Sequence, residues 1–107
     1  MQRPVPACQR FHTAADLLGK RWTALIVQAL ITRPRRYCEL VQALDAVSER
    51  MLIQRLKELE RAGVIQRRVL DERPVGVEYR LTNMGRGLGR VVDELERWAD
   101  QWIPATK

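Results

Sequence analysis

Apolar residues recur at helical spacing over two segments in the first half of the chain. In residues 22–30 they lie at i, i+3, i+4, i+7 and i+8, on one face of a helix: Trp22, Leu25, Ile26, Ala29 and Leu30. The same spacing predicts a shorter helix over about residues 37–44. Pro34 lies between the two segments and ends the first, because proline cannot continue a helix. The pattern thus predicts two successive amphipathic helices.

The N-terminal segment lacks this regular spacing. Prolines near its start oppose helix formation, so residues 1–11 are expected to form an irregular arm. A short helix is then predicted from His12 or Thr13 to Leu18, and Gly19 is its stop signal.

The segment over residues 48–62 has two chemically different faces. Ser48 is a good N-cap and Gly63 is a natural C-cap, so both ends of a helix are marked. Its apolar stripe consists of Leu52, Leu56, Leu59 and Ala62. The opposite face carries charged and amide side chains, at Arg50, Gln54, Arg55, Lys57, Glu58 and Arg61. Such a helix can bury one face in its own domain and present the other to a polar partner.

Beyond Gly63 the period changes from helical to two. Residues 64–70 and 77–81 suit two strands, and the stretch DERPVG between them is a charged turn that contains Pro and Gly. The two strands predict a hairpin with a basic tip at Arg73.

A last helix is predicted from Thr82 or Asn83 onward. Trp98 and Trp102 are interpreted as anchors of a dimer interface, because large aromatic residues supply much of the contact area in small interfaces. The alternative is that they line an effector pocket. The predicted interface follows the apolar stripe of this helix, at Leu88, Val91, Val92, Leu95, Trp98 and Trp102.

The order of helices, hairpin and closing helix is that of a winged helix-turn-helix domain. The predicted fold class is mainly α with a small β-hairpin, and one such domain with a C-terminal dimerisation helix fits residues 12–107. A chain this short is marginal as an isolated monomer, so pairing with a second copy would add stability.

Charge supports double-stranded DNA as the partner of this fold. The chain has 19 Lys and Arg against 13 Asp and Glu, and the net charge of +6 favours a polyanion. A major groove accepts one helix, in which arginine pairs with guanine and glutamine with adenine. The candidate contacts are Arg35, Arg36, Ser48, Glu49, Arg50, Gln54, Arg55, Lys57 and Arg73. The alternative is solvated surface charge, neutralised in part by Glu39, Asp71 and Glu72.

The composition opposes an enzyme or a metalloprotein. His12 is the only histidine and the two cysteines form no Cys-x-x-Cys pair, so no catalytic set, metal site or cofactor is expected. Unpaired thiols, a polar N-terminus and the lack of a long apolar run favour a cytoplasmic protein without a membrane span. A protein-interaction module is disfavoured because the outer face of residues 48–62 is basic. Non-specific architectural DNA binding stays open as an alternative.

Five segments in order carry a specific resemblance, which runs from about Cys8 to Trp102. They are LLGKRWTALIVQAL, RPRRYCELVQAL, SERMLIQRLKELERAGVIQRRV, VEYRLTNMGRGL and ELERWADQW. In these the chain closely resembles the HxlR-type helix-turn-helix regulators of bacteria, a branch of the MarR-like group. The resemblance implies a homodimer formed mainly by the first and last helices, with 48–62 as recognition helix and 64–81 as wing. It also implies gene regulation, in some members in response to electrophiles or oxidants.

The two cysteines lead to separate expectations. Cys8 is the candidate sensor of oxidants or electrophiles, which requires a partly ionised and accessible thiol; a structural role in the dimer interface is the alternative. Cys38 stands where the family pattern suggests Ser or Thr, whose hydroxyl would cap the third helix. We expect Cys38 to pack against the core, and a second redox role is the alternative.

Overall fold

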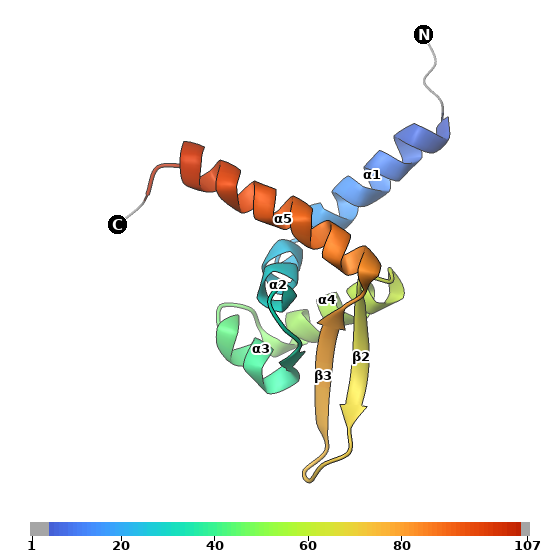
Figure 1. Ribbon diagram of the computed structural model, residues 1–107, viewed down its shortest axis with the longest axis vertical. Coiled ribbons are helices and arrows are strands. Elements are labelled where there is room, and N and C mark those ends of the chain that lie inside the picture. The colour runs from blue at the N-terminus through green and yellow to red at the C-terminus, as the bar shows by residue number, and fades with distance from the viewer. Residues whose placement is uncertain (1–4, 106–107) are drawn as a thin grey trace.

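The computed structural model describes residues 5–105, with side chains from residue 9 onward (Figure 1). It contains five helices and three strands within these residues. In chain order they are α1 (Val5–Gly19), α2 (Thr23–Leu30), β1 (Arg35–Arg36), α3 (Tyr37–Ala43), α4 (Glu49–Arg61), β2 (Ile65–Leu70), β3 (Gly76–Leu81) and α5 (Asn83–Trp102). The fold class is therefore mainly α with a small sheet, as the sequence predicts.

Helix α1 is longer than expected. It begins at Val5, so the expectation of an irregular arm is wrong for residues 5–11. Pro6 does not prevent this, because a residue in the first turn of a helix needs no intrahelical N–H bond. The helix ends at Gly19, the stop signal identified in the sequence.

Helix α2 begins one residue later than its apolar spacing predicts. Trp22 has a positive φ of 78° and precedes the helix, and the Arg21 guanidinium lies 4.7 Å from the centroid of its ring. The buried side chains are Thr23, Ile26, Val27 and Leu30, whereas Leu25 is 43% exposed. The buried side differs from the predicted one because α2 lies at the centre of the domain and contacts α1, α3, α5 and β3.

Helices α3 and α4 form the helix-turn-helix pair close to their predicted positions. The Ser48 hydroxyl accepts a hydrogen bond from the Met51 N–H at 3.1 Å, so Ser48 caps α4 as predicted. The cap of α3 is Arg36 and not Cys38, and the Glu39 carboxylate accepts from the Arg36 N–H at 2.8 Å. Residue 38 lies inside α3, two residues beyond its cap.

The sheet has one strand more than the predicted hairpin. All neighbouring strands are antiparallel in the order β1-β3-β2, with Ile65 opposite Leu81 and Arg35 opposite Tyr79. Strand β1 has only two residues, too few to produce a period in the sequence. It fixes the segment before α3 to the wing.

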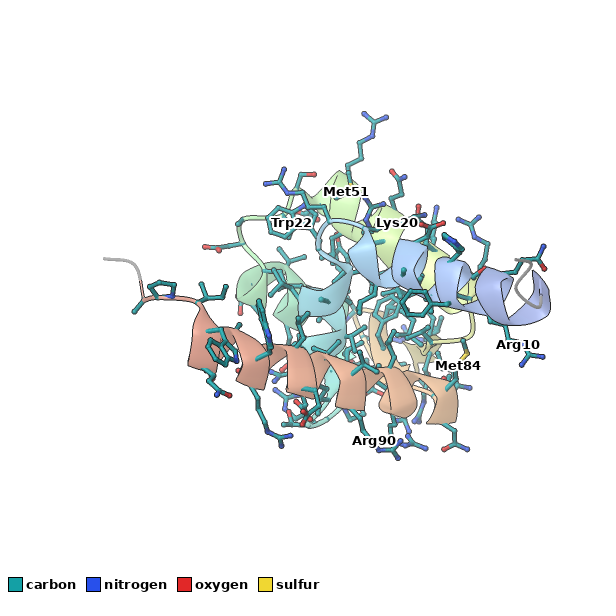
Figure 2. All side chains as sticks on the ribbon, turned by 90° about the horizontal axis from the view of Figure 1, so that it is seen from above. Arg10, Lys20, Trp22, Met51, Met84 and Arg90 are labelled. Carbon is teal, nitrogen blue, oxygen red and sulfur yellow. The ribbon has the colours of Figure 1, made fainter. Side chains whose placement is uncertain are left out.

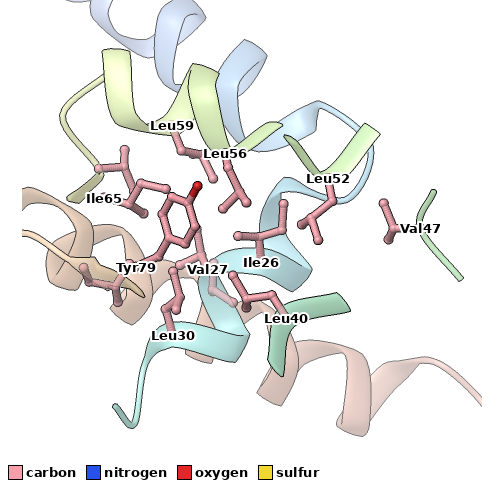
Figure 3. Packing of buried hydrophobic residues seen from close by; sticks show 13 residues of the cluster. Ile26, Val27, Leu30, Leu40, Val47, Leu52, Leu56, Leu59, Ile65 and Tyr79 are labelled. Atoms are coloured by element: carbon pink, nitrogen blue, oxygen red, sulfur yellow. The ribbon is translucent and has the colours of Figure 1, made fainter. Parts of the chain in front are cut away.

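One core lies between α2, α3, α4 and the base of the wing (Figure 3). Ile26 and Val27 of α2 are fully buried in it, and Tyr79 of β3 packs against the same cluster. The buried hydrophobic residues are Ile26, Val27, Leu30, Leu40, Val47, Leu52, Leu56, Leu59, Val64, Ile65, Tyr79, Leu81 and Val92. This core positions α4 and the wing relative to each other.

A tight junction joins the wing to α5. The Thr82 hydroxyl accepts from the Gly85 N–H at 3.0 Å and donates to the Gly63 carbonyl oxygen at 2.5 Å. A Cβ atom on Gly85 would lie 2.0 Å from the Val64 carbonyl oxygen, so this position requires glycine. The glycines at the start of α5 thus permit close approach to the base of the wing.

Candidate nucleic-acid interface

Helix α4 buries one face and leaves the other open. Leu52, Leu56 and Leu59 are each 1% exposed, which completes the predicted apolar stripe. No part of the described chain covers the opposite side. Its exposed residues are Glu49, Arg50, Ile53, Gln54, Lys57, Glu60 and Arg61. The face that the sequence assigned to a polar partner is therefore accessible.

Arg50, Gln54 and Lys57 lie on this open face. Between residues 9 and 105, no salt bridge reaches Arg50 or Lys57. Gln54 makes only a long hydrogen bond, 3.4 Å from its Nε2 to Glu58. These three side chains can therefore turn toward a ligand at little cost.

Arg55 does not belong to this open face, contrary to the sequence prediction. Its Nε donates to the Arg21 carbonyl oxygen at 2.8 Å, and its Nη1 lies 3.1 Å from Glu58. The side chain is only 13% exposed. Residue 55 directly precedes buried Leu56, at the edge of the stripe, so its guanidinium ties α4 to the turn before α2.

Glu58 is the centre of this cluster of side chains. Burial raises the pKa of its carboxyl, but hydrogen bonds from Gln54 and the charges of Lys20 and Arg55 lower the pKa below its ordinary value. Lys20 lies 3.5 Å away from the carboxylate. Glu58 therefore stays ionised and holds Arg55 against the domain.

Ser48 and Glu49 are engaged within the chain at the start of α4. Ser48 uses its hydroxyl as the helix cap, and Glu49 accepts from the Tyr37 hydroxyl at 2.8 Å. Burial, together with this carboxylate, raises the pKa of Tyr37 to about 12. Both residues thus fix the start of α4 against α3.

The arginines before α3 are also held by the chain. Arg35 is half-buried and its Nε donates to the Ala29 carbonyl oxygen at 2.9 Å, so Arg35 is not part of a free basic turn. Arg33 pairs with Glu39 at 2.9 Å, and this bond, with the Arg36 N–H, lowers the pKa of Glu39 to about 2. The charge of Arg33 is therefore neutralised within the chain, in agreement with the alternative interpretation of the surface charges.

Arg36 pairs with the wing. Its Nη2 donates to Glu72 Oε2 at 2.8 Å, and its Nη1 pairs with the second carboxylate oxygen. The charge of Arg36 is thus neutralised by Glu72, one of the three acids that the alternative interpretation of the surface charges includes. Asp71, another of these acids, takes part in no ion pair within the described residues.

A cleft of about 750 Å³ separates the wing from α3 and α4. Four cationic side chains line it, and Glu72 is the one carboxylate among the lining residues. The cations are Arg36, Lys57, Arg67 and Arg73. Arg73 is exposed at the tip of the wing, as predicted. The cleft therefore joins the open face of α4 to a basic wing.

Arg67 lines this cleft together with Arg73, behind which it lies in the predicted hairpin. Its partner across the hairpin is Tyr79, so the two side chains lie on the same face of the sheet. The period of two in residues 64–70 already places residue 67 on the side of buried Ile65. That alternation predicts the side of the wing on which Arg67 lies.

Cys38 lies at the same cleft and is exposed, so the expectation that it packs against the core is wrong. As the second residue of α3 it precedes the buried position Leu40 and points away from it. The side chain of Cys8 lies outside the described residues, and its environment is not described.

Helices α1 and α5 lie on the opposite side of the molecule from the wing tip (Figure 1), and exposed hydrophobic residues line this side. A groove of about 610 Å³ runs between these helices, with Met84 at its border (Figure 2). Along α5 the large hydrophobic residues have between 46% and 64% of their surface exposed; these are Val91, Leu95, Trp98 and Trp102.

Two of the predicted interface residues instead serve the domain itself. Val92 is 4% exposed and belongs to the core, so its assignment to a dimer interface is wrong. Leu88 is half-buried against that core and borders the groove between α1 and α5. The period of the stripe did not separate the side of α5 that faces α2 from the side that faces solvent.

Two further observations limit the chemistry of the described residues. They contain no cluster of three or more His, Cys, Asp or Glu side chains suited to a metal ion. None of their helices combines the length and apolar character that crossing a membrane requires.

The family model described as HxlR-like helix-turn-helix matches residues 17–107. This chain belongs to the HxlR-like family. The resemblance seen in the sequence is thereby confirmed. The matched range includes the open face of α4, the wing and α5.

The relatives of the HxlR-like protein include two from Bacillus subtilis (strain 168). It is 47% identical over 96 residues to the uncharacterized HTH-type transcriptional regulator YvaP, covering 90% of this chain and 89% of YvaP. It is 43% identical over 95 residues to the HTH-type transcriptional regulator YodB, covering 89% of this chain and 85% of YodB.

Solved structures agree with these relatives. Reduced YodB from B. subtilis superposes with a TM-score of 0.78 and 39% identity over 100% of both chains. The redox regulator HypR in its oxidized form gives a TM-score of 0.83 and 28% identity, covering 90% of this chain and 99% of HypR. The HxlR-like protein is thus a winged helix-turn-helix transcriptional regulator, and its relatives are regulators rather than enzymes.

Proposed function

We propose that this regulator binds a DNA operator sequence-specifically as a homodimer, with one α4 helix in the major groove of each of two half-sites. The open polar face of α4 is the observation that carries the proposal. It is the surface that a recognition helix requires: fixed by three buried leucines on one side and free of the described chain on the other.

Arg50 and Gln54 are the proposed base-reading residues. They are four residues apart on one helix, so they lie on the same side and one turn apart. Arginine pairs bidentately with guanine and glutamine with adenine. The N-terminus of α4, with backbone N–H groups near Ser48, supplies a phosphate site beside them.

We propose that the DNA backbone binds in the cleft between α4 and the wing. Lys57 approaches it from α4, while Arg67 and Arg73 approach it from the wing. Phosphate contacts from these side chains carry no sequence information but fix the register of the helix in the groove. The excess of cations over carboxylates in the cleft supports this assignment.

A second copy of the chain is the proposed occupant of the apolar surface on α5. Leu95, Trp98 and Trp102 are exposed on one side of this helix, and Phe11 of α1 is 74% exposed. A two-fold interface uses the same patch on both subunits, so no further partner is needed to cover it. The dimer would then hold two α4 helices at a fixed separation.

A thiol-based response is proposed from the relatives. YodB has been solved in diamide-treated and quinone-bound forms, and HypR in oxidized and reduced forms. We infer that Cys8 gives this chain a similar response to oxidants or electrophiles. Diamide or a quinone should then change DNA binding by the natural chain and by Cys38→Ser, but not by Cys8→Ser. Equal responses in the two variants would contradict the assignment.

Sequencing of genomic fragments bound by the purified protein tests the main proposal. The expected result is one shared motif with two related half-sites, separated by about one helical turn of DNA or a multiple of it. Gel shifts at two salt concentrations then compare this duplex with a scrambled one. A binder without sequence preference would lose affinity equally on both duplexes as salt rises, and would contradict specific recognition.

A further inference from the structure

The pair of Arg36 and Glu72 is a contact between two parts of the proposed DNA-binding surface. Arg36 lies at the junction of β1 and α3, and Glu72 lies in the turn between β2 and β3. Both guanidinium nitrogens Nη1 and Nη2 bond to the carboxylate, one to each oxygen. The side chains are 47% and 35% exposed, so an incoming ligand can reach the pair.

Gly76 of β3 lies against this ion pair, and its lack of a side chain leaves room for the Glu72 carboxylate. A Cβ atom there would lie 2.8 Å from Glu72 Oε1 and 3.5 Å from Arg36 Nη1. The first of these distances is too short for a real carbon–oxygen contact. Any side chain at residue 76 therefore displaces the carboxylate, the flexible end of Glu72, from its position.

Glu72 contacts Arg36 in a geometry that a phosphate can also adopt. An arginine fork binds carboxylate and phosphate oxygens in the same bidentate geometry. Glu72 is the one carboxylate among the residues that line the cleft, in which Lys57, Arg67 and Arg73 supply further positive charge. The charge of Arg36, which faces this cleft, is thus cancelled by the protein's own wing.

We propose that Glu72 competes with DNA phosphate for Arg36 and so limits the protein's affinity for duplexes of any sequence. The inference rests on the proposed DNA-binding function and adds a residue that opposes binding. An exposed ion pair is weak, so a phosphate can displace the carboxylate, but each displacement reduces the gain from the new contact. Base contacts of α4 then contribute a larger share of the total affinity.

The test measures binding of a labelled duplex of mixed sequence to the full chain over a series of salt concentrations. Glu72→Gln removes the competitor, and Asp71→Asn removes the same charge from the adjacent residue, which has no ion pair among the described residues. Gly76→Ala displaces the carboxylate without changing the net charge.

Glu72→Gln and Gly76→Ala should each bind about twofold to tenfold more tightly at low salt. The slope of log affinity against log salt should steepen by about 0.9 for each Arg36 that gains a phosphate. Asp71→Asn should keep the natural slope. Adding Arg36→Gln to Glu72→Gln should remove the gain.

The inference is overturned if Asp71→Asn matches Glu72→Gln, if Gly76→Ala keeps the natural slope, or if the gain survives without Arg36. These results differ from failure of the proposed function. In that case the natural chain and all variants would fail to bind this duplex, and the purified protein would recover no genomic fragments with a shared motif.

Discussion

Helices α4 and α5 are both amphipathic, but the domain buries the apolar face of α4 and leaves much of the apolar face of α5 exposed. In α4 the stripe of leucines is 1% exposed at each position. In α5 the stripe is about half exposed, from Val91 to Trp102. The comparison teaches that an apolar stripe predicts burial without saying which molecule supplies the cover. The domain covers the stripe of α4 but leaves much of the stripe in the second half of α5 exposed.

Length explains this difference. Helix α4 has 13 residues and lies over the core along its whole buried side, whereas α5 has 20 residues and spans about 30 Å. The buried residues of α5 are Gly85, Gly89 and Val92, all in its first half. Its second half extends beyond the core, so about half or more of the surface of Leu95, Trp98 and Trp102 stays exposed.

The largest expected effect is on the buried apolar stripe of α4. Leu56→Ala should lower the free energy of unfolding by about 2–5 kcal/mol, because it leaves a cavity among fully packed side chains. Denaturant unfolding followed by circular dichroism measures this loss. Gln54→Ala, on the open face of the same helix, is the control and should change stability little. Comparable losses in the two variants would contradict the two-faced description of α4.

The exposed apolar stripe of α5 is tested by placing a charge on it. Trp102→Asp should weaken dimerisation by about 30-fold or more, as expected for an aromatic anchor worth about 2 kcal/mol. Sedimentation equilibrium measures the dissociation constant, and Leu95→Asp should act in the same direction. Asp100→Asn, on the opposite side of the helix, is the control. A dimer that persists in both stripe variants would exclude α5 as the interface.

The open face of α4 is tested separately from its buried side. Arg50→Ala or Gln54→Ala should each cost about 1–3 kcal/mol on the operator and relax base preference, since each would lose a bidentate base contact. Competition between operator and scrambled duplexes measures this. Arg55→Ala should lower stability and leave base preference intact, because Arg55 bonds to the Arg21 carbonyl oxygen. Relaxed preference in Arg55→Ala would show that the open face is wider than described.

The smallest effect concerns the wing. Arg73→Ala should weaken binding to all duplexes alike and make the salt dependence shallower by about 0.9 per lost phosphate contact. Salt titrations on operator and scrambled duplexes measure the two slopes. Arg90→Ala, on α5 and away from the wing, should leave both slopes unchanged (Figure 2). Loss of affinity confined to the operator would instead assign Arg73 to base reading.

The sequence by itself determined the elements whose signals are local. The period of 3.6 between Leu52 and Leu59, the cap at Ser48 and the period of two around Tyr79 each arise within a few residues. These signals were enough for the order of helices and wing, and for the polar face of α4. Strand β1 was missed because two residues contain no period.

Only the tertiary structure decided which charges are free and which apolar residues are covered. Arg36 and Arg50 are alike in the sequence, yet Arg36 meets Glu72 from 36 positions away while Arg50 meets no described acid. Val92 and Leu95 belong to one stripe, yet the core covers only Val92. Ion pairing and burial depend on residues that folding brings together. Spacing along the chain does not show how close such residues lie in space.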